Sequence, residues 1–247
     1  MIKFFKSRAR DGSAVAGKKR FFLAALMMPF LLAACANSAQ PTADASSVVD
    51  FREYVVYRID DSRYITIRSK HPCISGQMDG QIFYYDSSKN IRTFVSFTGG
   101  ENTGLYRGYY AVHSTSNYIA IPSRSESEVR GGLLHINYSH DGGRTFQWFL
   151  LGNDDLHYAV IQNENDLYVT KVDHRGLIGY SDRSDFVLDI NQNMDPDDSH
   201  YSNTAPAIER YGKPVARQKI PLNMKSPSGA THWTCPTTSK DQVSLGK

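Results

Sequence analysis

The sequence predicts an all-β protein. Short runs rich in Tyr, Phe, Val, Ile and Thr recur along the chain, and Gly, Asn, Asp and Ser separate them. This composition is typical of short strands joined by turns. No long stretch shows the 3.6-residue apolar period of an amphipathic helix. One turn motif near the middle of the chain then favours an array of short antiparallel sheets.

The first expected strands cover residues 54–59 and 64–67. They flank Asp60-Asp61-Ser62-Arg63, a polar four-residue turn, and together predict a β-hairpin. A last strand-like patch covers Thr231–Cys235, within the Pro-, Ser- and Gly-rich segment that begins at Pro221. Similar runs between these two regions predict strands at residues 81–85, 92–97, 105–112, 118–121, 133–138, 145–151, 157–161, 166–172 and 177–180.

The turn motif is Ser139-His140-Asp141-Gly142-Gly143-Arg144-Thr145-Phe146, which matches the Asp-box pattern Ser-x-Asp-x-Gly-x-Thr-aromatic. We expect Asp141 to accept hydrogen bonds from the amides of its own turn and the two glycines to supply positive φ angles. Phe146 should enter the next strand and pack beneath the turn. The motif predicts a stabilised hairpin and no chemistry. Its defining residues are Ser139, Asp141, Gly143, Thr145 and Phe146.

Weaker copies of this motif surround Asp86 and Asp182, so the three aspartates stand 55 and 41 residues apart. Such spacings approximate the repeat of about 40–50 residues found in propeller blades. The spacing therefore predicts a small propeller-like array of about four sheets. Because two of the three copies are degenerate, a β-sandwich is the alternative.

The N-terminal region has the pattern of an export signal. Residues 1–20 hold seven basic side chains and one acid, and an apolar run of 14 residues follows from Phe21 to Ala34. This run is shorter than the 20 or so residues of a membrane span. Leu32-Ala33-Ala34-Cys35 resembles the lipobox of bacterial lipoproteins, so we expect cleavage before Cys35 and acylation of Cys35 with fatty acids such as palmitate. The alternative is an ordinary signal peptide in which Cys35 happens to follow small residues.

This interpretation divides the chain into four parts: a signal peptide at 1–34, the lipidated cysteine and a flexible tether at 35–50, a single all-β domain at 51–236 and a flexible tail at 237–247. By resemblance to enterobacterial lipoproteins, Ala36 after the cysteine implies sorting to the outer membrane of a Gram-negative bacterium, facing the periplasm. The full chain has 28 basic and 25 acidic residues, a net charge of +3. The signal peptide alone carries +6, so the remainder carries −3 and does not predict nucleic-acid binding.

Two cysteines remain once Cys35 is lipidated. The periplasm oxidises exposed thiol pairs, so a Cys73–Cys235 disulfide is expected, and two unpaired buried thiols are the alternative. Such a bond would place the start and the end of the domain side by side.

The sequence predicts neither an enzyme nor a cofactor. It lacks the Gly-x-Ser-x-Gly, His-Glu-x-x-His, Gly-x-x-x-x-Gly-Lys and Cys-x-x-Cys signatures. Residues 189–198 alternate Asp and Asn as a calcium loop does, but Met194 stands where the tight turn needs Gly. His200 likewise stands where a bidentate Glu is expected. A solvated acidic loop is therefore the preferred interpretation, and no metal site is predicted.

The segment 123–132 is charged with both signs and lies between two expected strands, so it is predicted to be a loop that binds a partner. An idle mobile loop is the alternative. A second charged turn follows at 153–157. The candidate partner-binding residues are Arg124, Glu126, Glu128, Arg130, Asp154, Asp155 and His157.

Four stretches, taken in order, resemble one known family. They are residues 56–64, residues 82–86 with Ile91-Arg92, the Asp-box at 138–146, and Ser226–Cys235. With a lipobox in front, this set resembles the Tli-type immunity lipoproteins encoded beside type VI secretion lipase effectors. The resemblance covers about residues 54–236, whereas segments 99–132 and 187–205 depart from the family pattern.

The resemblance implies a non-enzymatic function in interbacterial competition. The protein would bind a secreted phospholipase or lipase effector, as an inhibitor held at the periplasmic membrane surface by its lipid anchor. The divergent segments leave the cognate effector unidentified. Two other functions stay open at this point: an Asp-box glycan-binding or glycan-cleaving lipoprotein, and a structural lipoprotein of the cell envelope.

Overall fold

The computed structural model describes residues 50–99, 104–114, 117–128, 131–153, 158–171, 185–194, 206–235 and 242–243. The chain divides into two compact units, Met1–Ser46 and Ser47–Lys247, and all described residues belong to the second. The expected signal peptide, the lipidation site Cys35 and the tether up to residue 49 lie outside them, so these assignments stay predictions.

The prediction of an all-β fold is confirmed. The N-terminal sheet has the order β13-β1-β2-β3-β4 and is antiparallel throughout. The expected first hairpin is present, because β1 pairs with β2 around the turn at Asp60. The bounds of these strands are β1 (Arg52–Arg58), β2 (Arg63–Ser69), β3 (Gly80–Asp86), β4 (Ile91–Thr98) and β13 (Gln242–Val243).

Strand β13 corrects the expectation of a flexible tail over 237–247. Tyr54 and Glu53 of β1 pair with Gln242 and Val243, so at least these two tail residues belong to the sheet. Local composition cannot show this pairing, because the partner strand lies almost 190 residues earlier in the chain.

Two further sheets follow. The hairpin sheet is antiparallel with the order β6-β7-β8, and the C-terminal sheet has the order β12-β11-β10-β9-β5, in which β5 runs parallel to β9. The strands of the hairpin sheet are β6 (Ile119–Ser127), β7 (Gly131–Ser139) and β8 (Gln147–Asn153). Those of the C-terminal sheet are β5 (Tyr110–His113), β9 (Tyr158–Asn163), β10 (Asp166–Lys171), β11 (Phe186–Asp189) and β12 (Lys213–Pro214).

The described residues thus form three sheets, not the expected four or so, and none of the three closes on itself. Of the expected strands, 105–112 is strand only from Tyr110, and 177–180 lies outside the described residues. The two helices described are short: α1 (Pro206–Tyr211) and the 3₁₀ turn η2 (Arg217–Lys219). No helix within the described ranges is long and apolar enough to span a membrane.

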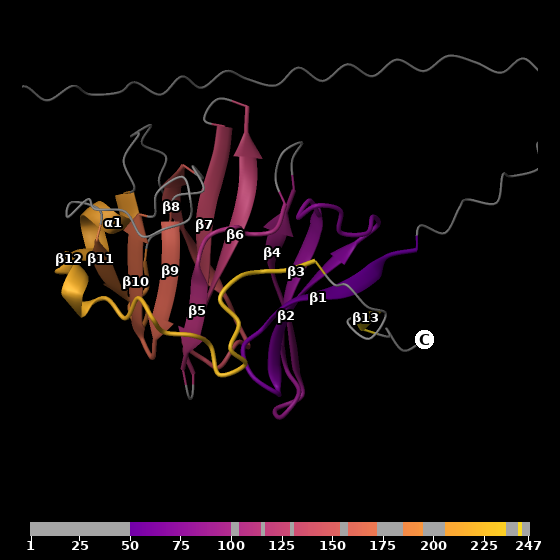
Figure 1. Cartoon of the computed structure of the whole chain (residues 1–247), viewed down its shortest axis with the longest axis horizontal. Coiled ribbons are helices and arrows are strands. Elements are labelled where there is room, and N and C mark those ends of the chain that lie inside the picture. Colours follow the sequence, from indigo (N-terminus) through magenta and orange to yellow (C-terminus); the bar gives the residue numbers. More distant parts are fainter. Residues whose placement is uncertain are drawn as a thin grey trace, which may run out of the picture. The chain divides into compact units, whose positions relative to one another are not determined.

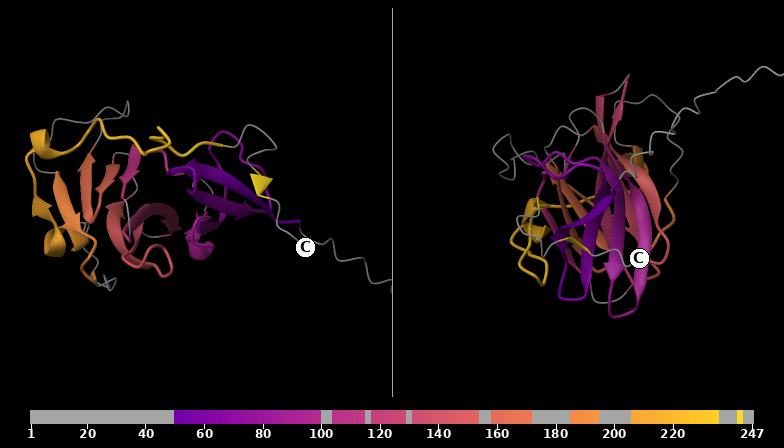
Figure 2. Two further views of the ribbon diagram at one scale, coloured as in Figure 1. Left: turned by 90° about the horizontal axis from the view of Figure 1, so that it is seen from below. Right: turned by 90° about the vertical axis from the view of Figure 1, so that its right-hand side faces the viewer.

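One apolar core joins the three sheets. Contacts of β6 with β4 on one side and β9 on the other place the hairpin sheet between its neighbours, as Figures 1 and 2 show. Ala120 and Ile121 of β6 point to opposite faces of their sheet, and both are fully buried. Residues of this core include Ile65, Ile82, Tyr84, Ile136, Phe149, Val160 and Leu188.

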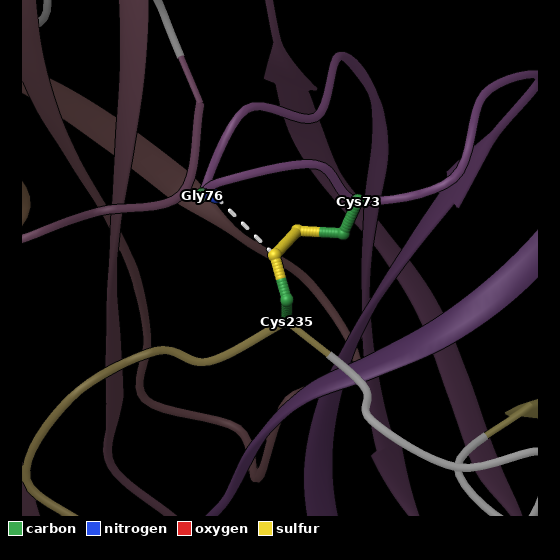
Figure 3. The surroundings of a disulfide bond; sticks show 3 residues. All are labelled: Cys73, Gly76 and Cys235. Atoms are coloured by element: carbon green, nitrogen blue, oxygen red, sulfur yellow. Dashed lines mark hydrogen bonds between the residues drawn. A yellow bond between two sulfur atoms is a disulfide. The ribbon is translucent and has the colours of Figure 1, made fainter.

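A disulfide joins Cys73, which follows β2, to Cys235 near the end of the described chain, with an S–S distance of 2.02 Å and a Cα–Cα distance of 5.5 Å. Figure 3 shows this bond, together with the hydrogen bond from the Gly76 amide to the Cys235 sulfur at 3.3 Å. The start and the end of the domain therefore lie side by side.

The segment Thr231–Cys235 is not a strand, although its composition predicts one. Its backbone instead bonds to two separate elements: the Thr234 amide donates to Val56 in β1 at 2.9 Å, and the Tyr110 amide of β5 donates to Thr231 at 2.8 Å. Because these partners belong to different sheets, no continuous ladder forms. The segment packs its buried Trp233 against Tyr106 and Tyr110.

Candidate protein-interaction site

The prediction that segment 123–132 is a loop is wrong, because most of the segment belongs to two paired strands. Strand β6 continues to Ser127 and β7 begins at Gly131, so Arg124 pairs with Leu134 and Ser127 pairs with Gly131. The segment is the distal half of a long hairpin that projects beyond the neighbouring strands (Figure 1). A two-stranded ribbon that reaches past the core has few apolar neighbours to pack against, so its polar composition resembles that of a loop.

Only part of the predicted interaction set is exposed on this hairpin. Glu126 and Glu128 are exposed near the tip. Arg124 is only 6% exposed, so its side chain belongs to the fold and offers little surface to a partner. Arg130, Asp154, Asp155 and His157 lie outside the described residues, and their role stays a prediction.

The Asp-box residues build the turn between β7 and β8. The Asp141 carboxylate accepts bonds from the Ser139 hydroxyl at 2.7 Å, the Arg144 amide at 2.9 Å, the Thr145 amide at 3.0 Å and the Thr145 hydroxyl at 2.6 Å. Burial alone would raise the pKa of Asp141, but these hydrogen bonds outweigh it and lower the pKa to about 2. The carboxylate is therefore fully engaged within its own turn.

This turn also touches the N-terminal sheet. The Phe146 ring lies 5.9 Å from the Tyr84 ring in an edge-to-face arrangement. Gly143, at φ +86°, lies so close that a Cβ atom there would stand 2.1 Å from Cε1 of Tyr84. The motif thus connects two sheets, a structural role that leaves none of its defining side chains for chemistry.

The Asp- and Asn-rich segment 189–198 shows a similar structural role at its first residue. Asp189 accepts hydrogen bonds from the Asn165 side chain at 2.8 Å and from the Asn191 amide at 3.0 Å. Among the described residues no group of three or more His, Cys, Asp or Glu side chains could hold a metal ion. Residues 195–200 of the pattern lie outside that part of the chain.

The outer face of the N-terminal sheet carries a surface that the sequence did not single out. Strand register aligns Arg58, Tyr64, Tyr85 and Arg92 in one row across β1 to β4. The next rows are Val55, Thr66, Phe83 and Phe94, and then Glu53, Arg68, Gln81 and Phe97. We call the aromatic face the set Arg58, Tyr64, Arg68, Phe83, Tyr85, Arg92, Phe94 and Phe97.

Ring and cation contacts hold this face together. Tyr64 stacks on Tyr85 with ring centroids 4.8 Å apart, and Phe94 packs edge-on against Phe97 at 5.0 Å. The Arg92 guanidinium lies 3.9 Å from the centroid of Phe83, a cation–π geometry. These contacts restrict the side chains before any partner arrives.

Beneath the rings lies a buried carboxylate, that of Glu53. It accepts hydrogen bonds from the Thr66 hydroxyl at 2.5 Å and the Tyr85 hydroxyl at 2.6 Å, and it pairs with Arg92 at 3.1 Å. Burial, followed by the bond to Glu53, raises the pKa of Tyr85 above its ordinary value, so Tyr85 stays a neutral donor. The network orients Arg92 and Tyr85 within the face.

One sequence signal could have indicated this face. In Gln81-Ile82-Phe83-Tyr84-Tyr85 the residues of both strand faces are large and mostly apolar, whereas a strand solvated on one side normally alternates apolar with polar residues. The pattern indicates that large apolar side chains lie on both faces of the strand, but it does not tell which face packs on the core.

Comparison with known proteins identifies the family. Among curated proteins, no match to this chain was found. A family model described as the T6SS Tli3 immunity protein matches residues 49–173, just over half of the chain. This span includes β1 to β4, the complete hairpin sheet and the Asp-box turn. The chain therefore belongs to the Tli3 family of type VI secretion system immunity proteins.

Proposed function

We propose that this protein is a lipid-anchored immunity protein that binds a type VI secretion lipase or phospholipase in the periplasm and blocks its active site or its access to the membrane. Membership of the Tli3 immunity family is the observation that carries the proposal. An immunity protein acts by binding its effector, which agrees with a non-enzymatic role for this chain.

The fold supports action by binding. Three sheets around one core form a rigid scaffold, and a disulfide is suited to an oxidising compartment such as the periplasm. Two acids at the tip of the β6–β7 hairpin and the aromatic face both present side chains to a partner. Such surfaces give specificity through complementary shape and charge.

The lipobox at Leu32–Cys35 adds a role for the membrane. Acyl chains on Cys35 would confine the inhibitor to the surface that a lipase must reach, and so raise its effective concentration there. A soluble copy of the domain would bind the same effector but would protect the membrane less well.

A competition assay tests the proposal. Cells that lack this gene are mixed with sister cells that fire the effector encoded beside it, and survival of the recipients is counted. We expect the deletion strain to be killed, the wild-type gene to restore survival, and Cys35→Ala to restore it only in part, with loss of radiolabelled palmitate from the protein.

Two controls sharpen this assay. A donor whose effector lacks lipase activity must not kill the deletion strain. Survival of that strain against the active donor would refute the immunity function, and would favour a structural role in the envelope. Full protection by an unlabelled Cys35→Ala protein would refute only the role of the anchor.

A further inference from the structure

We propose that the effector docks on the aromatic face of the N-terminal sheet, with Phe94 and Phe97 as anchors, through a surface that is apolar at its centre and acidic around it. This inference rests on the proposed function and assigns the surface and the partner chemistry to it. It differs from the sequence-based hypothesis, which places the contacts on the β6–β7 hairpin and the turn after β8.

The first argument is exposure. Phe94 is 43% exposed and Phe97 is 63% exposed, although both are large apolar rings on the same strand. Phe83 lies below them, only 6% exposed, with its ring 5.8 Å from that of Phe94. A contiguous apolar patch on a soluble protein marks an interaction site more often than scattered single residues do.

The second argument is preorganisation. The rings stand on paired strands and pack edge-on against each other, so binding restricts little further motion. Aromatic and arginine side chains supply most strong contacts in protein interfaces, because they bury a large area at a small entropic cost. The aromatic face combines both kinds of side chain in adjacent rows.

The third argument is charge. The acid within these rows, Glu53, is fully buried and already paired with Arg92. Apart from the Glu53–Arg92 pair, the charged side chains of these rows are Arg58 and Arg68, and among the described residues no ion pair joins either of them to an acid. The exposed Asp79 stands beside Gly99, next to the row of Phe97. A partner with carboxylates around an apolar centre would complement this arrangement.

The same charges disfavour two other occupants. A second copy of the chain docked face to face would place four arginines, Arg58 and Arg68 of each copy, in one interface, and an excess of like charges in an interface is unfavourable. Recognition of an anionic bilayer typically uses four to eight clustered cations. This region offers fewer, since Arg92 is neutralised by Glu53.

Binding of the full domain to a catalytically inactive form of the neighbouring effector tests the proposal. Truncating a central anchor typically weakens an interface by 30-fold or more. We therefore expect Phe94→Ala/Phe97→Ala to raise the Kd by at least about 30-fold. Trp148→Ala is the matched control, because Trp148 is an aromatic of similar exposure, 45%, on β8 of another sheet. It should change the Kd by less than about threefold.

A double charge-reversal variant provides a second, independent test of the docking surface. Arg58→Glu/Arg68→Glu should slow association by about tenfold or more at low salt and weaken its dependence on ionic strength. Lys219→Glu, an exposed basic residue of η2, is the control and should leave the rate unchanged. An unchanged thermal unfolding temperature of each variant shows that the fold is intact. If the phenylalanine variant unfolds, the association rate of the Arg58→Glu/Arg68→Glu variant tests the docking surface instead.

The outcomes separate the two proposals. Wild-type affinity in both sets of variants, with protection intact, overturns the docking surface and leaves the immunity function standing. A wild-type protein that neither binds the effector nor protects cells overturns the immunity function itself. The docking proposal also fails if the variants bind the effector with wild-type affinity but no longer bind phosphatidylethanolamine–phosphatidylglycerol vesicles, or no longer self-associate in light scattering. In those cases the aromatic face would contact a membrane or a second copy of the chain.

Discussion

Replacing Gly143 by alanine tests whether the Asp-box turn couples the hairpin sheet to the N-terminal sheet. Gly143 has φ +86°, and an added Cβ would stand 2.1 Å from Cε1 of Tyr84. Tyr84 is 1% exposed, so its ring is enclosed by neighbouring side chains and cannot move out towards solvent. The variant carries two costs: about 1 kcal/mol for the left-handed backbone and about 1–3 kcal/mol for overpacking against the ring.

The expected loss in the free energy of unfolding is therefore about 2–4 kcal/mol. For a domain of this size that corresponds to a fall in Tm of roughly 5–15 °C. Urea denaturation followed by intrinsic fluorescence measures the loss, and a constant m-value would confirm that the change is one of stability.

Gly142→Ala is the matched control for this variant. Gly142 has φ +79°, but its added Cβ would lie no closer than 3.4 Å to a neighbour, the end of the Arg144 side chain. It should carry the backbone cost alone, about 1 kcal/mol. In a Tyr84→Leu background, which removes the ring, the Gly143→Ala cost should fall to that same value. Equal losses for the two alanine variants in the wild-type background would refute the reasoning.

Three further predictions concern stability. Replacing Cys73 and Cys235 by alanine should lower the free energy of unfolding by up to about 5 kcal/mol, since the bond closes a loop with a separation of 162 residues; a urea midpoint insensitive to reductant would contradict this. Folding lowers the pKa of Asp141 to about 2, so the ionised carboxylate stabilises the folded protein. This contribution to the free energy of unfolding is present above pH 4 and is lost as the pH falls towards 2. After allowance for solvent screening this is about 1 kcal/mol, and Asp141→Asn should remove that part of the acid dependence in denaturation curves at graded pH; an unchanged slope would refute it. Arg92→Ala should cost about 2 kcal/mol because it leaves the buried Glu53 carboxylate without its cation, and adding Glu53→Gln should recover part of the loss; strict additivity in the double-mutant cycle would show that the pair is uncoupled.

Predictions from sequence succeeded where the causes are local. The first hairpin follows from two Tyr- and Ile-rich runs around Asp60, which accepts the Arg63 amide at 2.7 Å within its own turn. The Asp-box turn likewise satisfies Asp141 with residues at most four positions away. The Cys73–Cys235 bond joins residues 162 apart and is the exception: the sequence predicts it by cysteine count, because only two cysteines remain after Cys35.

Predictions failed where distant segments decide the structure. The composition around Arg124 predicts a loop where the structure has a hairpin, because polar residues in a ribbon beyond the core resemble those of a loop. The composition of residues 237–247 predicts a flexible tail and misses strand β13, because the partner of this strand in β1 is remote in sequence. Thr231–Cys235 has the composition of a strand, but its neighbours belong to two different sheets.

The sequence by itself determined the all-β class, the turn at Asp141 and the resemblance to the immunity family, because short-range patterns carry all three. Only the tertiary structure decided which face of the N-terminal sheet is covered. Strand β3 is aromatic or apolar on both faces, so its periodicity cannot choose between them. The hairpin sheet and the Asp-box turn pack against the face that carries Ile82 and Tyr84, and so cover it. The opposite face, with Phe94 and Phe97, therefore stays exposed.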